Sequence, residues 1–359
     1  REVAYTTERV SDVARVLAGM PLHAENPLKD LESLESWKSH ATQIDSAWHQ
    51  LQEERLKVIA RFQAAELNDP AITRCALLYP FGGPDVMNTL ALFPHNQSYI
   101  LIGLEPVGVT PDQAALRTHL DGLLAATRTS LDSLLQRSFF ITREMDRSLR
   151  GQLFDGVLPA ILVQLVRMDA RIGAVNSVSI AEGGVIVPWD RTKYGPRAVR
   201  NGGVEIIFRR PGFPVAQRLY YFSVNLGPRL ARNAAFLAYL DRLAPTSTFL
   251  KATSYMPHQD GFRVLCNKLL AVSGVILQDA SGIPYRYYQT PVWQVQLYGA
   301  YEKPYGSFHY LLQKDLHSAY EVPGAAKPLE FRIGYGYSKV PSNLLLARRK
   351  PVGNHGAGK

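Results

Sequence analysis

The chain has almost no cysteine. Its 359 residues include only Cys75 and Cys266, which excludes a disulfide framework and a cysteine-rich zinc module. We expect both thiols to be buried as small apolar side chains, and a single bridge between them is an open alternative in an oxidising compartment. Hydrophobic residues make up 46% of the sequence, so a chain of this length can fold around its own apolar core without metal or disulfide support.

Long apolar runs and familiar catalytic motifs are also missing. No apolar run reaches the roughly 18 residues of a membrane span, and the longest, around residues 157–166, predicts a buried helix. The patterns G-x-S-x-G, H-E-x-x-H and the P-loop lysine motif do not occur, which argues against the hydrolases and phosphate-binding enzymes that carry them. Charge, aromatic residues and the ends of predicted strands are therefore the informative features.

The chain is basic, with 40 lysines and arginines against 31 acidic residues and a formal charge of +9. Such a surface favours anionic partners, among them a membrane face, an acidic polysaccharide or a nucleic acid, but no nucleic-acid-binding motif accompanies it. The first residue is Arg1 and not Met. Such a start is expected of a chain from which a signal peptide has been removed, and equally of a chain that was trimmed. The densest basic segments are residues 191–200, 209–210, 229–232 and 348–350.

Two short apolar runs organise the predicted fold. Residues 75–79 stop at the turn Pro-Phe-Gly-Gly-Pro-Asp of residues 80–85, and residues 98–104 form the second run. Both runs predict buried strands. Only about two helical turns, over residues 86–92, fit between them, so the segment predicts a parallel strand–helix–strand unit.

The carboxyl ends of these two strands carry the first candidate site. Ligands of open α/β sheets bind at such strand ends, where this sequence places Gly82, Gly83, Asp85 and Glu105. The spacing from Gly82 to Glu105 resembles that of a Rossmann-type nucleotide site, which makes the two glycines candidate cofactor-binding residues, although G-x-G-x-x-G is absent and no cofactor is assigned. The alternative is that the glycines only form the turn and that Asp85 caps the helix.

The first 70 residues predict two helices, over residues 7–19 and 40–67, because their apolar residues recur at helical spacing. From residue 171 the pattern changes to short alternating or apolar runs between Gly/Pro turns, which predicts antiparallel strands in the middle third. We therefore expect an α/β (or α+β) protein with a mixed sheet, Rossmann-like strand–helix units, an antiparallel middle section and an N-terminal helical layer. The predicted divisions are the helical layer 1–70, the mixed domain 71–350 and a flexible tail 351–359.

Three acidic residues at predicted strand ends converge if their strands are parallel neighbours. These are Asp85, Glu105 and Asp279, and His258 can join them from the loop before a helix. Carboxylates beside a histidine suit general acid–base catalysis or metal binding, and we treat the four as candidate catalytic residues without assigning a metal. The alternative is that each caps a separate helix or turn. Placement of residues 74–104 and 245–280 in separate sheets would exclude a shared site.

The last third of the chain is rich in tyrosine. Its tyrosines can form a stacking surface for sugar rings or bases, or simply occupy half-buried strands. They follow a predicted turn in which Gly282 is expected to take a positive φ and Asp279 to accept backbone N–H groups that hold it ionised. The tyrosines concerned are Tyr285, Tyr287, Tyr288, Tyr298, Tyr301, Tyr305 and Tyr310.

Three sequence blocks carry a resemblance. They are YPFGGPD (residues 79–85), ILIGLEPVG (100–108) and QDASGIPYRYY (278–288). Together they resemble an uncharacterised family of bacterial secreted or lipid-anchored proteins with YPF-x-GPD, GLEPVG and QD-x-SGIPY blocks. The resemblance implies a precursor with a signal peptide and a periplasmic or extracellular location, and it implies no activity.

Two functional hypotheses follow. The first is a secreted binding or interaction protein that uses its basic surface and tyrosine-rich C-terminal third to hold an anionic or glycan-like partner of the cell envelope. The second is an α/β enzyme, hydrolase-like or dependent on a nucleotide cofactor, whose site combines Asp85, Glu105, His258 and Asp279. A catalytic site requires these groups to face one pocket and at least one of them to have a perturbed pKa.

Overall fold

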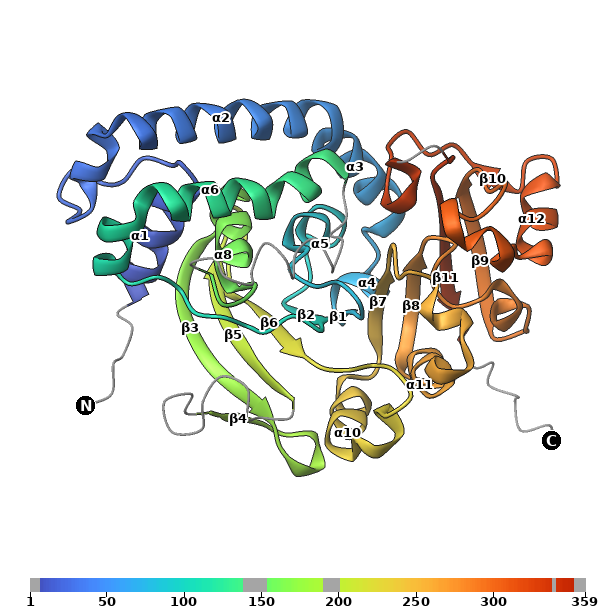
Figure 1. The fold of residues 1–359 in the computed structure, drawn as a ribbon. Coiled ribbons are helices and arrows are strands. Elements are labelled where there is room, and N and C mark those ends of the chain that lie inside the picture. The colour runs from blue at the N-terminus through green and yellow to red at the C-terminus, as the bar shows by residue number, and fades with distance from the viewer. Residues whose placement is uncertain (1–6, 138–153, 190–200, 338–339, 352–359) are drawn as a thin grey trace.

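The computed structural model describes residues 7–137, 154–189, 201–337 and 340–351. They form an 11-stranded mixed sheet with helices on both of its faces (Figure 1). The predicted α/β class with a mixed sheet is confirmed. The basic segment 191–200 and the tail from residue 352 lie outside the described residues.

Five parallel strands form the centre of the sheet, so their carboxyl ends lie at the same end of it. The segments 74–104 and 245–280 therefore share one sheet, as a shared site requires. Helix α5 (Val86–Leu92) follows the first strand and leads to its parallel neighbour, which confirms the predicted strand–helix–strand unit. In spatial order the five strands are β8 (Ser273–Gln278), β7 (Thr246–Leu250), β1 (Ala76–Tyr79), β2 (Ser98–Gly103) and β6 (Gln217–Ser223).

Strands with antiparallel pairing flank this centre on both sides. Beyond β6 lie β5 (Gly202–Arg209), β3 (Arg171–Ile180) and β4 (Ile186–Pro188). Beyond β8 lie β11 (Asn343–Arg349), β9 (Trp293–Gly299) and β10 (Ala326–Lys327). The predicted antiparallel middle section is confirmed, except that β6 also pairs in parallel with β2. The sequence pattern does not predict β11, because the arginines at its end indicate a basic surface patch.

Helices cover the two faces of the sheet unequally. One face carries a layer in which α2 and α6 run side by side (Figure 1), and α1 of this layer packs against both α8 and β3. The other face is covered by α10 (Ala234–Leu243), α11 (Arg263–Val272) and α12 (Lys314–Glu321). The first layer contains α1 (Thr7–Leu17), α2 (Glu35–Leu51), α3 (Lys57–Phe62), α5, α6 (Gln113–Arg137) and α8 (Leu158–Arg167), and α4 (Pro70–Thr73) leads into β1.

The second predicted helix, residues 40–67, is longer and less regular than its periodicity indicates. It begins earlier, at Glu35. The π-helical turn η2 (Gln52–Leu56) interrupts it, and a second π-helical turn, η3 (Gln63–Leu67), ends it. Such turns add a residue to the helical repeat and redirect the side chains that follow. Since α6 and α8 belong to the same layer, the boundary at residue 70 stays a prediction.

The sheet separates two apolar cores. Along β1, Leu77 and Tyr79 belong to the core under the N-terminal helices, whereas Leu78 belongs to the core under α10 and α11. This alternation arises because successive side chains of a strand point to opposite faces. Central parallel strands are buried on both faces, which explains why they occur in the sequence as continuous apolar runs.

Both cysteines are free thiols, so no bridge joins them. Cys266 is buried in α11, as expected, and burial raises the pKa of its thiol to about 11. Cys75 precedes β1 and is only half-buried, which corrects its expected placement inside the strand.

Candidate functional site

Four charged side chains lie close together at the carboxyl ends of β1, β7 and β8. Lys251 directly follows β7, and its Nζ lies 2.6 Å from Oδ2 of Asp85, with only 1% and 2% of the two side chains exposed. Asp279 directly follows β8, and Arg55 belongs to the π-helical turn η2. We call Arg55, Asp85, Lys251 and Asp279 the buried charge cluster.

Asp85 holds the turn after β1 and the start of α5 together. Its Oδ1 accepts the backbone N–H of Asn88 at 3.2 Å and the side-chain amide of the same residue at 2.9 Å. Its Oδ2 accepts the hydroxyl of Tyr79 at 2.9 Å in addition to the contact with Lys251. The interpretation of Asp85 as a helix cap is confirmed, and the cap is at the same time one half of a buried ion pair.

Asp279 accepts three hydrogen bonds from the turns around it. Its Oδ2 accepts Ala252 N–H at 2.8 Å, and its Oδ1 accepts the N–H and the hydroxyl of Ser281 at 2.9 and 2.5 Å. The predicted acceptance of backbone N–H groups is confirmed. Burial raises the pKa of Asp279, and the hydrogen bonds and the charge of Lys251 oppose this shift only in part. The expectation that the turn holds the carboxyl ionised stays a prediction.

Lys251 experiences opposing influences on its charge. Burial lowers the pKa of its ammonium group, the carboxylate of Asp85 raises it, and the guanidinium of Arg55 lowers it. Because burial excludes water from all four side chains, the cluster owes its stability to mutual pairing and not to solvation. Its first role is to tie three strand ends and a helix together.

The loop that follows Lys251 has an unusual backbone. Ala252, Ser254 and Tyr255 have φ values of 49°, 55° and 53°, in the left-handed region that residues with a Cβ seldom occupy. Side-chain hydrogen bonds fix the loop, since Thr253 N–H donates to Ser281 Oγ at 2.9 Å and Ser254 N–H donates to Tyr335 Oη at 2.9 Å. Backbone strain of this kind concentrates at functional sites.

The structure places the other two candidate catalytic residues outside this cluster. Glu105 belongs to the β2–β6 side, where its Oε2 accepts Leu104 N–H at 3.1 Å and its carbonyl accepts the hydroxyl of Tyr221 at 2.8 Å. His258 ends the 3-10 turn η6 (Met256–His258), its ring packs 5.1 Å from that of Tyr255, and burial lowers its pKa to about 4. Among the described residues, no hydrogen bond or ion pair joins either of them to Asp85 or Asp279.

The two glycines predicted to bind a cofactor have clear structural roles. Gly83 has a φ of +53°, and a Cβ at Gly82 would lie 2.7 Å from the ring of Tyr79, so turn geometry and close packing both require glycine here. Neither residue lines the two cavities described below. Their cofactor role stays a prediction.

Gly282 is a glycine for a different reason than predicted. It does not have a positive φ, which corrects the turn argument. A Cβ at this position would instead lie 2.6 Å from Oε1 and 3.0 Å from Cβ of Gln278. Hydrogen bonds hold that glutamine side chain in place, with Ile283 N–H donating to its Oε1 at 2.9 Å and its Nε2 donating to the carbonyl of Ile283 at 2.7 Å.

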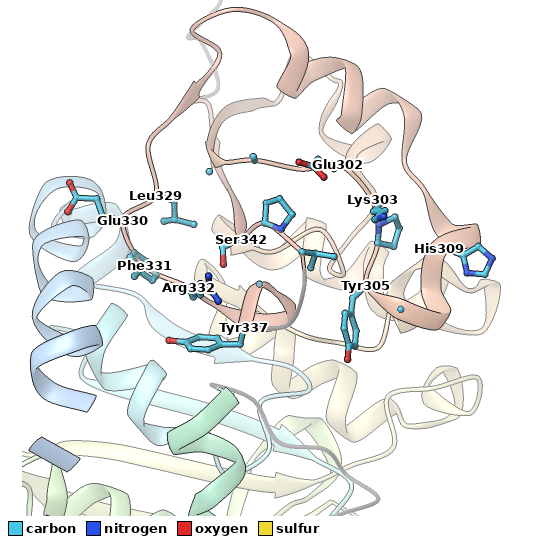
Figure 2. A pocket seen from close by; sticks show the side chains of 17 residues that line it. Glu302, Lys303, Tyr305, His309, Leu329, Glu330, Phe331, Arg332, Tyr337 and Ser342 are labelled. Atoms are coloured by element: carbon cyan, nitrogen blue, oxygen red, sulfur yellow. The ribbon is translucent and has the colours of Figure 1, made fainter. Parts of the chain in front are cut away.

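A large cleft lies beside the C-terminal strands. It has a volume of about 1520 Å³, and its lining residues lie within the segment 299–309 at the end of β9 and within the ranges 329–337 and 340–342 before β11. Figure 2 shows Lys303, Tyr305 and His309 on one side and Arg332 on the other, with Tyr337 below Arg332 in this view. We call it the C-terminal cleft.

The charges in the C-terminal cleft differ from those of the buried charge cluster. Lys303 and Arg332 are exposed and form no ion pair or hydrogen bond with any other residue that the structure describes. Glu330 is neutralised by Arg61 at 3.2 Å, whereas Glu302 has no such partner in the described part of the chain. The cleft is therefore mixed in charge, with two available cations.

Stacked tyrosines connect the cleft with the strained loop. Tyr305 and Tyr335 stack with ring centroids 5.3 Å apart and an interplanar angle of 12°, and Tyr335 stacks on Tyr255 at 6.1 Å and 5°. The tyrosine-rich region was expected either to form a stacking surface or to occupy half-buried strands. Different residues fit the two interpretations, because Tyr305 lines the cleft whereas Tyr288 and Tyr298 are buried. The sequence pattern missed Lys303, Arg332 and Tyr335, although a lysine two residues before Tyr305 was a usable signal.

Over the ranges described, no helix combines the length and apolarity that crossing a membrane requires. No group of three or more His, Cys, Asp or Glu side chains is arranged to hold a metal ion in the same ranges. Comparison with family models, curated proteins and solved structures gives no match for this chain.

Proposed function

We propose that the chain is a binding protein of the cell envelope and that it holds an acidic glycan in the C-terminal cleft. The observation that carries the proposal is the combination, in one cleft, of two available cations, Lys303 and Arg332, with the aromatic side chains of Tyr305 and Tyr337. The periplasmic or extracellular location is part of the proposal, and its support is the resemblance of three sequence blocks to bacterial secreted or lipid-anchored proteins.

The chemistry of the lining favours an acidic sugar over other polyanions. Tyrosine rings offer apolar faces for the C–H faces of sugar rings together with a hydroxyl for hydrogen bonding. Lysine and arginine pair with carboxylate or sulfate groups, arginine through a planar fork. The carboxylate of Glu302 would repel a densely charged polyanion but accepts hydrogen bonds from sugar hydroxyls, so a ligand with both anionic groups and hydroxyls fits best.

The size of the cleft indicates an oligomeric ligand. Pockets for single small molecules usually enclose roughly 300–1,000 Å³, whereas this cleft encloses about 1520 Å³. Exposed ion pairs are each worth only about 0–1 kcal/mol and weaken with salt. We therefore expect modest affinity for each sugar unit, accumulation of affinity with chain length, and loss of binding at high ionic strength.

The enzyme hypothesis receives less support from the geometry. Only Asp85 and Asp279 of its four residues belong to one cluster, and they are 1% and 5% exposed. Glu105 and His258 lie in separate hydrogen-bond and packing environments. The four-residue catalytic site remains a prediction, and the separation of its members favours the binding proposal.

Retention on immobilised polygalacturonate, with neutral dextran as the uncharged comparison, tests the proposal. We expect the wild-type chain to be retained at about 0.05 M salt and released at about 0.5 M, where screening is much stronger. The double variant Lys303→Gln/Arg332→Gln should lose most of this retention.

The matched control is Arg171→Gln/Lys350→Gln, which removes the same charges from exposed positions outside the cleft. It should be retained like the wild type apart from a small effect of net charge. No retention of the wild type at low salt, or an equal loss in both double variants, would exclude the C-terminal cleft as an acidic-glycan site.

A further inference from the structure

A second, smaller cavity lies against the inner wall of the C-terminal cleft. The two share lining residues, among them Lys303 and Tyr305, and the smaller one extends to Asp279, Ser281 and Asn343. Its volume is about 10 Å³, close to the roughly 10–15 Å³ that a single water molecule needs. We call it the inner pocket. It has room for about one polar heavy atom.

The acceptor in the inner pocket is the carboxylate of Asp279. A carboxylate offers about four acceptor positions, and the described residues supply three donors, namely Ala252 N–H and the N–H and hydroxyl of Ser281. Ser281 Oγ itself donates to Asp279 and accepts Thr253 N–H at 2.9 Å. Asp279 therefore has capacity for one more donor, whereas the hydroxyl of Ser281 is already committed.

The donor in the inner pocket is the amide of Asn343. Its Oδ1 accepts the backbone N–H of Ala280 at 2.7 Å, which fixes the orientation of the amide because a backbone N–H cannot pair with the NH₂ group. Its Nδ2 makes no hydrogen bond to any residue that the structure describes. The free Nδ2 of Asn343 and the carboxylate of Asp279 thus line the same space, which is the size of one oxygen atom and which Lys303 also lines.

We infer that the inner pocket recognises a hydroxyl group of the bound sugar, with Asp279 accepting its proton and Asn343 donating to its oxygen. A hydroxyl is the group that both donates and accepts. An ammonium group has no lone pair for Asn343, and a carboxylate would meet the carboxylate of Asp279. The inference rests on the proposed function, because it names the chemical group that the same site selects.

The position of Lys303 narrows the ligand further. Lys303 lines both the C-terminal cleft and the inner pocket, so an anionic group of the ligand can pair with it while a neighbouring hydroxyl enters the inner pocket. A sugar ring that carries a carboxylate and hydroxyls on the same unit meets both requirements. The ligand class is therefore a hydroxy-carboxylate sugar, such as a uronic acid unit, held beside the ring of Tyr305.

The test compares Asn343→Asp with wild type for binding of tetragalacturonate, measured by calorimetry. The substitution keeps an oxygen for Ala280 N–H but replaces the free donor with an acceptor. We expect the affinity to fall at least about tenfold, because the substitution removes one hydrogen bond, repels the hydroxyl oxygen and adds a negative charge near the anionic ligand. Asn225→Asp is the matched control, because Asn225 Oδ1 also accepts a backbone N–H, that of Gly227 at 2.9 Å, outside both cavities.

A second arm uses tetragalacturonate whose hydroxyls are acetylated, so that its carboxylates remain and its hydroxyl donors are lost. Acetylation should weaken binding to wild type and to Asn225→Asp by about tenfold more than binding to Asn343→Asp, because only the first two have a hydroxyl contact to lose. If Asn343→Asp does not fold, the affinities of wild type for the two ligands alone decide whether the inner pocket recognises a hydroxyl.

The outcomes separate the two proposals. If wild type binds tetragalacturonate, and neither Asn343→Asp nor acetylation weakens that binding beyond the control, the inner pocket does not recognise a hydroxyl while the cleft remains a glycan site. If wild type binds no tetragalacturonate at low salt, both the inner-pocket inference and the proposed acidic-glycan function are wrong.

Discussion

The buried charge cluster and the C-terminal cleft use the same residue types for opposite purposes. In the cluster, Lys251 and Asp85 are almost completely shielded from water and pair at 2.6 Å. In the cleft, Lys303 and Arg332 are exposed and have no partner among the described residues. A shielded charge must be paired within the protein, whereas an exposed charge can remain available to a ligand. The comparison therefore favours a structural role for the cluster and supports the proposed binding role of the cleft.

The largest effect should follow from breaking the buried pair. Lys251→Met leaves Asp85 without its cation, and removal of one partner of a buried pair typically costs about 3–5 kcal/mol. Urea unfolding at neutral pH measures the loss. Lys303→Met removes the same charge from the cleft and should change the free energy of unfolding by no more than about 0.5 kcal/mol. Equal unfolding midpoints for the two variants would contradict the division between cluster and cleft.

The buried His40 provides the next test. Its surroundings disfavour the protonated, charged form of the ring, whereas the buried charge cluster pairs its charges. The ring of His40 is fully buried, and its Nδ1 accepts a hydrogen bond from Arg128 at 2.9 Å while its Nε2 lies 2.8 Å from the carbonyl of Leu17. Since arginine can only donate, the ring is neutral with its proton on Nε2. Burial and the charges of Arg128 and Arg167 lower its pKa from 6.5 to about 4.

The direction of the pH effect follows from this shift. Between about pH 6.5 and pH 4 the unfolded chain binds a proton at His40 that the folded chain does not, so stability falls as the pH falls through this window, by up to about 3 kcal/mol. Urea unfolding of wild type and His40→Gln across the window isolates the contribution, because the variant lacks the titrating ring. Wild type should lose about 3 kcal/mol more than the variant, and parallel pH curves would show that His40 titrates normally in the fold.

The helices and strands that the sequence predicts correctly are those whose formation depends on residues close together in the chain. Helix α5 begins and ends at the predicted residues, because Asp85 caps its first turn and too few residues separate the two strands for a longer helix. The central strands are recognisable because burial on both faces gives them continuous apolar runs. Lys251, by contrast, follows an ordinary strand, and nothing in its neighbours along the chain shows that Asp85 will lie beside it.

The rest of the candidate site depends on contacts between distant segments. Arg55 enters the buried charge cluster from a π-helical turn, which an apolar spacing of regular helical period does not reveal. Asp279 was predictable as a turn residue, but the inner pocket beside it also needs Asn343 from β11. The arginines at the end of β11 obscure the apolar pattern by which a strand is recognised in the sequence. Lys303 and Arg332 face one cleft only because β9 and β11 are neighbours in the sheet.

A smaller effect is expected at Gly282, where packing and not backbone conformation requires glycine. Gly282→Val would place side-chain atoms against Gln278, whose amide is held by Ile283 and by the hydroxyl of Tyr288 at 2.9 Å. Overpacking of this kind costs about 1–3 kcal/mol, which a thermal melt resolves. Gly274→Val is the control, since the nearest atom to a Cβ there lies 3.6 Å away. A melting temperature for Gly282→Val no lower than that of Gly274→Val would show that the loop near Gln278 moves to accommodate the added side chain.

At Arg332, a substitution should change binding clearly while it changes stability very little. Arg332→Gln removes an exposed guanidinium that no described residue contacts through a hydrogen bond or ion pair, so the free energy of unfolding should change by less than about 0.5 kcal/mol. Retention on polygalacturonate should nevertheless fall and become less dependent on salt, because one of the two available cations is lost. Arg332→Lys should restore part of the retention, since it returns the charge without the planar fork. A lower melting temperature for Arg332→Gln, or unchanged retention, would place Arg332 with the structural charges and leave Lys303 as the cation on which binding depends.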